Sequence, residues 1–301
     1  MIDGIINVYK PAGFTSFDVV AKLRGILKQK KIGHTGTLDP MAEGVLLVCL
    51  GKATKLVDML TEGDKCYHAV MKLGIETDTE DITGNIVRTD EVGITKTLTK
   101  ESVEEAILSF VGDYEQIPPM YSAIKKDGKK LYEYARNGIE IERQGRPVKI
   151  YDIQNITCED GMYGFDVSCS KGTYIRSLCR DIGRKLSCYA TLATLKRLCV
   201  HGYSVTDALT LQQIEASAKE GTLSAHIMPV DALLAMYPAF EITEQGKNYL
   251  HNGNKLSPRF FRTMPKMREK RIRVYEDGVF LALYDYVEAE DIYKPLKMFL
   301  S

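Results

Sequence analysis

Hydrophobic residues recur along the chain with two different periods, which predict a mixture of strands and helices. Continuous or alternating apolar residues predict strands at 45–50, 66–73 and 163–169. Apolar residues three and four positions apart predict helices at 14–32, 100–112, 128–137, 175–186 and 206–224. Near the C-terminus, Asp277-Gly278 between two β-rich runs predicts a hairpin. The order of elements indicates the α+β class, with a small β-rich module beginning near residue 237.

One loop of the predicted fold holds an acidic residue in a constrained backbone. Asp39 lies between Gly33 and the apolar run 45–50, in the stretch GHTGTLDPMAEGVLL. Because Pro40 follows it, the backbone of Asp39 is pushed towards an extended conformation. A carboxylate held in this way can act as a nucleophile, as it does in retaining glycosidases. It can equally be a turn former, and the residue pattern alone leaves both interpretations open.

The predicted helix 175–186 carries a second chemical feature. Arg176, Arg180 and Arg184 recur at every fourth residue and form a basic stripe beside the apolar face. An arginine next to a carboxylate favours the charged form of that carboxylate. The pattern therefore permits an aspartate nucleophile paired with an arginine, without demanding it.

Charge is balanced overall but unevenly distributed. The chain has 40 basic and 40 acidic residues, a balance that counts mildly against a nucleic-acid partner. However, residues 255–273 contain eight Lys or Arg and only one acid, Glu269. A basic face for a polyanion is therefore compatible with the neutral total.

Several classes of protein are not indicated by the sequence. No apolar run is long enough for a membrane span, and residues 1–13 do not resemble a signal peptide, so we expect a cytoplasmic protein. The seven cysteines form no CxxC pair, which indicates reduced, mostly buried thiols and no metal site. P-loop, Rossmann, HExxH and GxSxG motifs are absent. GHTG at 33–36 matches only half of the HxGH motif of nucleotidylyl transferases, which makes that class a distant alternative.

Five ordered blocks resemble the successive motifs of the bacterial tRNA pseudouridine synthase B (TruB) family. They cover most of residues 5–236, and the GHTGTLDPMAEGVL stretch is the most specific of them. The blocks are YKPAGFTSFDVV (9–20), KKIGHTGTLDPMAEGVLLVCLGKATK (30–55), KCYHAVMKLGIETDTEDITG (65–84), QIPPMYSAIKKDGKKLYEYARNG (116–138) and SKGTYIRSLCRDIG (170–183).

The resemblance implies an isomerase that converts uridine 55 in the T loop of tRNA to pseudouridine by base flipping. Asp39 matches the catalytic aspartate, which acts on the glycosidic bond of the uridine. Tyr67 matches the tyrosine that stacks on the flipped base and relays the proton lost from carbon 5. Arg176 matches the arginine that pairs with the aspartate. The attack position, on the base or on the ribose, stays open.

Further residues are implied to contact the RNA, and two others on the basic stripe are not. The implied RNA-binding residues are His34, Tyr174, Leu195, Lys10 and Lys171. Leu195 lies in a stretch, 195–205, that fits the family less closely than the other blocks. Arg180 and Arg184 are expected to face RNA or solvent and to take no part in catalysis.

The resemblance also implies a domain organisation. Residues 1–236 would form a pseudouridine synthase catalytic domain with a mixed or antiparallel sheet, in which 117–150 is a thumb-like RNA-binding insertion. Residues 237–301 resemble, more weakly, a small PUA-like RNA-binding domain. We expect no cofactor, no metal, no membrane and no obligate protein partner, and a monomer that binds the tRNA T stem-loop. Two alternatives remain: a guide-RNA-dependent synthase of the same superfamily, and a tRNA-binding folding helper in which catalysis is secondary.

Overall fold

The computed structural model describes residues 1–263 and 268–300, and the part of the basic run at 264–267 lies outside them. Most strands belong to one mixed sheet in the order β1-β3-β12-β4-β11-β10-β7. Its strands are β1 (Gly4–Lys10), β3 (Glu43–Leu50), β12 (Ala190–Val200), β4 (Lys65–Leu73), β11 (Met162–Cys169), β10 (Arg146–Glu159) and β7 (Gly112–Gln116). Two short strands extend it, β2 (Ile32–His34) beside β3 and β13 (Tyr203–Ser204) beside β12. The α+β class with a mixed sheet is thus confirmed.

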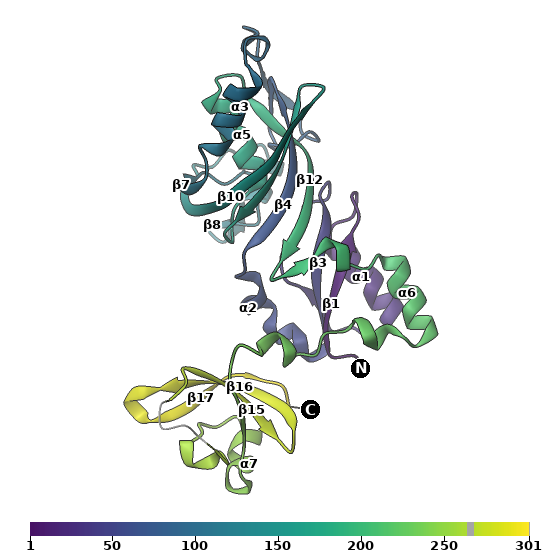
Figure 1. Cartoon of the computed structure of the whole chain (residues 1–301), viewed down its shortest axis with the longest axis vertical. Helices are drawn as coiled ribbons and strands as arrows, with labels where there is room; N and C mark the ends of the chain where they lie inside the picture. The colour runs from purple at the N-terminus through teal and green to yellow at the C-terminus, as the bar shows by residue number, and fades with distance from the viewer. Residues whose placement is uncertain (264–267, 301) are drawn as a thin grey trace.

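Helices cover the large sheet in two groups (Figure 1). The helices α3 (Lys100–Leu108) and α5 (Ile175–Lys185) pack on the half formed by β12, β4, β11 and β10. The helices α1 (Ser16–Leu27) and α6 (Leu211–Glu220) pack on the half formed by β1 and β3. Short α2 (Val57–Thr61) leads into β4. Of the helices in the described ranges, none has the length and apolar character that crossing a membrane requires.

Helix α1 begins near the predicted position but ends earlier than predicted. Thr15 caps it by accepting a hydrogen bond from the Asp18 amide, while the Asp18 carboxylate accepts one from Thr15. The prediction of helix up to residue 32 is wrong, because Lys28 adopts a left-handed backbone with φ of 50° and ends the helix. The chain then forms β2.

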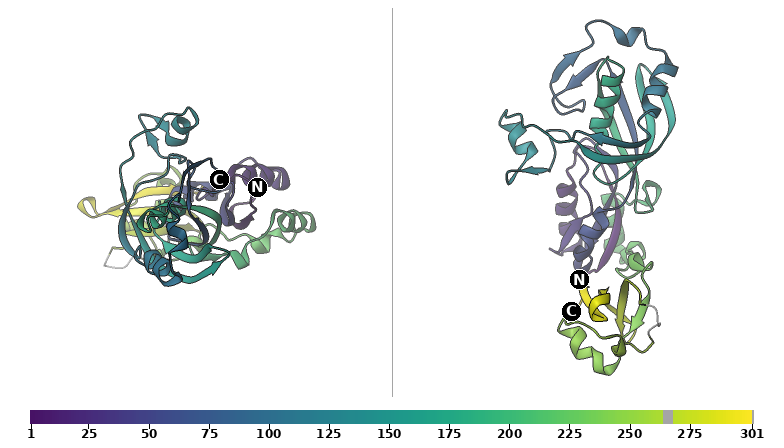
Figure 2. Two further views of the ribbon diagram at one scale, coloured as in Figure 1. Left: turned by 90° about the horizontal axis from the view of Figure 1, so that it is seen from above. Right: turned by 90° about the vertical axis from the view of Figure 1, so that its left-hand side faces the viewer.

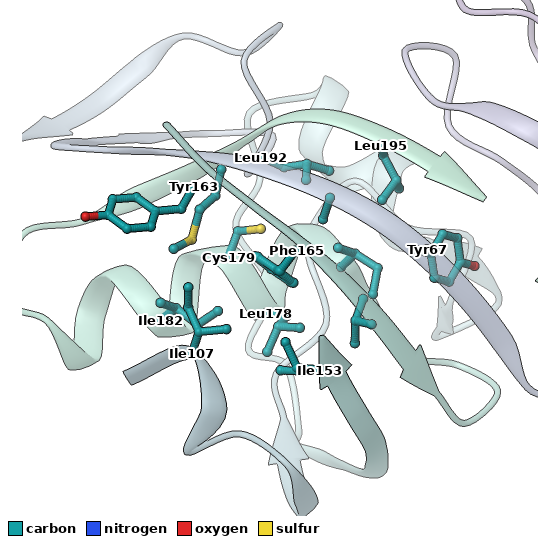
Figure 3. Packing of buried hydrophobic residues seen from close by; sticks show 14 of the residues in the cluster. Tyr67, Ile107, Ile153, Tyr163, Phe165, Leu178, Cys179, Ile182, Leu192 and Leu195 are labelled. Atoms are coloured by element: carbon teal, nitrogen blue, oxygen red, sulfur yellow. The ribbon is translucent and has the colours of Figure 1, made fainter. Parts of the chain in front are cut away.

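The core of the larger helix-covered half reaches the site described below. Strand β4 alternates as predicted, with Tyr67, Ala69 and Met71 buried on one face. These side chains meet Ile182 of α5 and Leu195 of β12 in one cluster (Figure 3). Tyr67 lies at one end of that cluster, so its ring is packed against the core while its hydroxyl is at the edge.

Residues 117–145 leave the large sheet and project from its side (Figure 2). They contain the hairpin β8 (Lys125–Lys126) and β9 (Lys129–Lys130) and the short helix α4 (Leu131–Arg136). The last five residues of the predicted insertion, 146–150, instead belong to β10 and pair with β7. The excursion is therefore shorter at its C-terminal side than the sequence suggested. A second hairpin, β5 (Ile75–Thr77) with β6 (Ile86–Thr89), carries the acidic stretch 76–81.

The C-terminal residues form a separate four-stranded sheet in the order β14-β15-β16-β17. Its elements are β14 (Ala239–Glu241), α7 (Glu244–His251), β15 (Arg271–Glu276), β16 (Val279–Val287) and β17 (Ile292–Met298). The predicted hairpin is confirmed, since Asp277 and Gly278 both take positive φ between β15 and β16. Leu283 and Phe299 of this part pack in one cluster with Val45 and Leu47 of β3. The boundary at 236/237 stays a prediction.

Two helical glycines test how tightly the fold is packed. A Cβ on Gly183 of α5 would lie 2.1 Å from the backbone nitrogen of Ala190, whereas a Cβ on Gly25 of α1 would meet nothing within 4 Å. Gly183→Ala should lower the free energy of unfolding by roughly 1–3 kcal/mol, because α5 must move away from β12. Gly25→Ala should raise it by about 0.5–1 kcal/mol through helix propensity. Chemical denaturation would measure both; equal effects of the two changes would contradict this packing.

Candidate active site

A buried lysine, Lys10, forms hydrogen bonds with the backbone of the loop that carries Asp39. Lys10 of β1 is fully buried, and its Nζ donates to the carbonyl oxygens of Pro11 (2.9 Å), Pro40 (3.3 Å) and Ala42 (2.5 Å). Burial lowers the pKa of Lys10 to about 8. These bonds fix the backbone on the C-terminal side of Asp39. Lys10, which was expected to bind RNA, thus has its amine bonded inside the protein and is not among the residues that line the cleft.

Arg176 joins the Asp39 loop to two other segments. Its Nε lies 2.8 Å from Oδ2 of Asp39, and Nη2 donates to Oδ1 at 3.2 Å. Nη1 donates to the carbonyl oxygen of Thr79 (2.9 Å), and Nη2 also donates to that of Tyr121 (3.0 Å). Arg176 is 4% exposed, whereas the Asp39 side chain is 34% exposed. The guanidinium is therefore a fixed support, and the carboxylate is accessible on its other side.

A cleft of about 780 Å³ opens in front of Asp39. Of the residues predicted from the sequence, it is lined by Asp39, Tyr67, Lys171, Tyr174, Arg176 and Leu195. Its volume is in the range of small-ligand sites. Segments that are far apart in the chain thus bring together a carboxylate, an arginine, two tyrosines and an apolar side chain.

The two predicted tyrosines occupy different environments in the cleft. Tyr67 is 7% exposed, and burial raises the pKa of its phenol, an effect that the nearby Arg197 opposes. Tyr174 precedes α5, and its backbone is held by the Gln116 side chain, with bonds of 2.7 and 3.0 Å. Burial also raises the pKa of Tyr174. Both rings are anchored at the wall of the cleft, where a planar ligand can stack.

His34 and Lys171 are placed less centrally. His34, on β2, is not among the residues that line the cleft, and its Nδ1 accepts a weak bond from the Gly36 amide at 3.4 Å. Burial and the charge of Arg197 lower the pKa of His34. Lys171 is exposed and forms an ion pair with Glu62, another residue of the cleft wall. The structure therefore puts Lys171 in the cleft wall and His34 outside the set of lining residues.

The expectation that Arg180 faces RNA or solvent is wrong. Arg180 is 3% exposed and forms a buried ion pair with Glu80, whose carboxylate also accepts a bond from Ser177 Oγ at 2.6 Å. Its Nη2 donates to the carbonyl oxygen of Ile117 at 2.9 Å. Arg184 is half exposed and pairs with Glu76 at 2.7 Å. Acids of the β5–β6 hairpin therefore pair with two of the three arginines of the stripe, Arg180 and Arg184, a contact that helical periodicity cannot reveal.

Several side chains in the cleft wall were not among the individually predicted site residues, although Tyr121, Tyr132 and Arg146 belong to the predicted insertion 117–150. They include Lys65, Tyr121, Tyr132, Arg146 and Arg197. Arg197 could have been found, because it follows Leu195 by two residues and so shares its face of β12. Within residues 1–263 and 268–300, no three His, Cys, Asp or Glu side chains gather as a potential metal site.

Comparison with protein families and known proteins gives consistent matches. The family model for the TruB family pseudouridylate synthase N-terminal domain matches residues 24–175. The model for the tRNA pseudouridylate synthase B C-terminal domain matches residues 176–235. A tRNA pseudouridine synthase B from Lachnoclostridium phytofermentans is 50% identical over 99% of this chain and 100% of its own. Another, from Clostridium kluyveri, is 45% identical over 92% of this chain and 93% of its own.

Solved structures with the same fold are more distant in sequence. A Cbf5-Nop10-Gar1 complex contains a chain with a TM-score of 0.72 and 25% identity, covering 99% of this chain and 85% of that one. An H/ACA ribonucleoprotein bound to a substrate RNA contains one with a TM-score of 0.70 and 23% identity, with the same coverage. These matches extend the fold over nearly the whole chain.

The buried Glu80–Arg180 pair gives a prediction for stability. Glu80→Ala should lower the free energy of unfolding by about 3 kcal/mol, because it removes the buried counter-ion of Arg180 and leaves only the more exposed Asp181. Glu215→Ala removes the exposed pair with Lys219 and should change it by about 0.5 kcal/mol or less. Urea titrations of the two variants make the comparison. A Glu80→Ala protein as stable as Glu215→Ala would show that the network does not support the fold.

Proposed function

Because the chain belongs to the TruB family of pseudouridylate synthases, it is a pseudouridine synthase, and we propose that its target is uridine 55 in the T loop of tRNA. The observation that carries the proposal is the half-exposed Asp39 carboxylate, held by buried Arg176 at the floor of a cleft with tyrosine walls. The two relatives named above are called tRNA pseudouridine synthases and match this chain over almost their full lengths. Since tRNA is the substrate, a cytoplasmic location is part of the proposal.

The proposed reaction rearranges one nucleotide and consumes no other reactant. The bond from N1 of uracil to C1′ of the ribose breaks, the base turns, and a bond from C5 to C1′ forms. C5 then loses its proton, and N1 gains one from solvent. Asp39 acts on the glycosidic bond as a nucleophile, at the base or at the ribose. Because Arg176 holds both carboxylate oxygens, it sets the direction from which Asp39 attacks.

The target uridine must leave the stack of the T loop to reach this cleft, at a cost of a few kcal/mol. In the proposal, stacking on Tyr67 offsets part of that cost, by about 1–3 kcal/mol. Leu195 packs against the base and Tyr174 lies beside the bound nucleotide. His34, which accepts a bond from the Gly36 amide, supports the loop through which the nucleotide enters.

Two surfaces outside the cleft are proposed to hold the RNA. The excursion 117–145 presents Lys125, Lys126 and Lys129, all exposed, at its tip. Lys130 and Arg136 lie 5.4 and 5.3 Å from the ring centroid of Tyr132, which pre-orders basic and aromatic groups on one side. We assign this segment as the thumb-like insertion, and residues 237–301 as a PUA-like module that contacts tRNA phosphates.

The proposed enzyme acts as a monomer without an obligate protein partner. The guide-RNA-dependent alternative is disfavoured, because this chain is 50% identical to a protein named for tRNA but only 25% identical to the Cbf5 complex chain. The folding-helper alternative is disfavoured by the intact pairing of Asp39 with Arg176, which binding alone does not require.

Tritium release tests the activity and the role of Asp39 together. With a T stem-loop RNA carrying 5-tritiated uridine, the wild-type protein should release tritium. Asp39→Asn, which removes the nucleophile, should reduce the rate by at least about 1,000-fold. Fluorescence anisotropy should show RNA affinity unchanged within about threefold. If neither protein releases tritium while both bind the RNA, the folding-helper alternative replaces the enzyme.

Substitution of Lys171 should change RNA affinity, whereas substitution of Lys10 should change the reaction rate. Lys171→Ala removes an exposed cation from the cleft wall, so it should weaken RNA binding and reduce the salt dependence by about one phosphate contact. Lys10→Met removes the support of the Asp39 loop, so it should slow the reaction at saturating RNA and leave the dissociation constant unchanged. Anisotropy and single-turnover assays at two salt concentrations measure both. Weaker binding by Lys10→Met with an unchanged rate would restore Lys10 as an RNA contact.

A further inference from the structure

Arg197 is a buried cation in the cleft wall, and it takes no part in the proposed attack by Asp39. It is 2% exposed and is among the largest fully enclosed side chains of the described residues. Nε donates to the carbonyl oxygen of Val45 at 2.7 Å, and Nη2 donates to that of Gly36 at 3.1 Å. These two bonds fix the plane of the guanidinium between β3 and the Asp39 loop.

Among the described residues, no carboxylate forms an ion pair with Arg197. In contrast, Arg176 pairs with Asp39 and Arg180 pairs with Glu80. The charge of Arg197 lowers the pKa of both Lys65 and His34. Burying a charge without a counter-ion costs free energy, so we expect the charge of Arg197 to stabilise another group in the cleft.

Tyr67 is the group that the sheet places against Arg197. The two residues are direct partners across the antiparallel pair β12–β4, so their side chains stand on the same face as neighbours. Burial raises the pKa of the Tyr67 phenol, and the nearby guanidinium of Arg197 acts against that rise. The other groups facing Tyr67 are Asp39 in its loop and Cys169 on β11, and both disfavour a phenolate. Arg197 is therefore the group here that favours a negative Tyr67 oxygen.

We propose that Arg197 is a positioning residue for Tyr67: it orients the phenol and stabilises the phenolate that takes the proton from carbon 5 of the rearranged base. The inference rests on the proposed function. The phenol first gives its proton to water. The C5–H bond then breaks, its proton passes to the phenolate oxygen, and its electron pair forms the C5–C6 double bond. The electron pair of the C6–N1 double bond moves to N1, which takes a proton from solvent. No oxidant or further reactant enters the step.

This role separates Arg197 from Arg176, although both are buried arginines beside Asp39. Arg176 holds the carboxylate that acts on the glycosidic bond, which is the early step. Arg197 bonds two carbonyl oxygens and lies across the strand pair from Tyr67, and it serves the late step of proton removal. A loss at Arg197 should therefore leave the early steps intact and make the removal of the C5 proton rate-limiting.

A double-mutant cycle with an isotope effect tests the proposal. Single-turnover pseudouridine formation is measured with T stem-loop RNA carrying hydrogen or deuterium at C5 of the target uridine. Arg197→Gln should slow the reaction by about 10- to 100-fold, the range of one acid–base contribution, and should turn the C5 isotope effect into a primary one. Arg197→Lys keeps the charge without the planar fork, so it should show the same trend to a smaller extent.

The decisive comparison uses Tyr67→Phe as the background. If Arg197 acts through Tyr67, Arg197→Gln in that background should slow the reaction by less than about twofold. Any loss of stability from Arg197→Gln is present in both backgrounds, so it cannot by itself make the two rate losses differ. Arg146→Gln is the matched control, an exposed arginine of the same cleft, and should change RNA affinity without changing the isotope effect. Should Arg197→Gln not fold, Arg197→Lys supplies the same comparison.

The outcomes are distinguishable. Equal slowing by Arg197→Gln in both backgrounds, or weaker RNA binding with no isotope effect, would overturn the inference and make Arg197 an RNA or structural contact. Absence of pseudouridine with the wild-type protein would overturn the proposed function itself. Coupled losses with a new primary isotope effect would establish Arg197 as the support of Tyr67.

Discussion

The ion pair between Asp39 and Arg176 is the interaction on which the site depends. A buried guanidinium uses its nitrogens on a carboxylate and two carbonyl oxygens, and these come from the Asp39 loop, the β5–β6 hairpin and the excursion 117–145. Because one rigid group serves all three segments, the position of the carboxylate is tied to the position of the segment proposed to grip RNA. The apolar cluster under α5 holds this group in place through Leu178 and Ile182.

Pairing of buried charges also explains how a chain with no net charge can serve a polyanion. Arg180 and Arg184 are neutralised by Glu80 and Glu76 of the β5–β6 hairpin. The lysines of the excursion stay exposed, and so do most of the acids outside the network. Arg176, Arg180 and Arg184 are thus matched by acids inside the fold, while Lys125, Lys126 and Lys129 of the excursion stay at the surface. The total charge conceals this separation.

The sequence predicted elements best where one face is uniformly apolar. Strand β4 and helix α5 follow from alternation and helical spacing. The 14-residue strand β10 was not predicted, because its pattern is mostly exposed and is interrupted by shifts in register. The burial of Arg180 was not foreseen, because a period tells which residues share a face of a helix but not which segment covers that face. Arg197 was missed because its partner, Tyr67, is more than a hundred residues away.

The central claim is that Arg176 fixes Asp39 for attack, and Arg176→Lys tests it most directly. A lysine keeps the positive charge but cannot hold two carboxylate oxygens and two carbonyls at once. Single-turnover pseudouridine formation at saturating tRNA should fall by roughly 100-fold or more, the effect of displacing a reacting group by about 1 Å, while the dissociation constant of the tRNA is unchanged. An unchanged rate with weakened tRNA binding would contradict the account and make Arg176 a contact for the RNA.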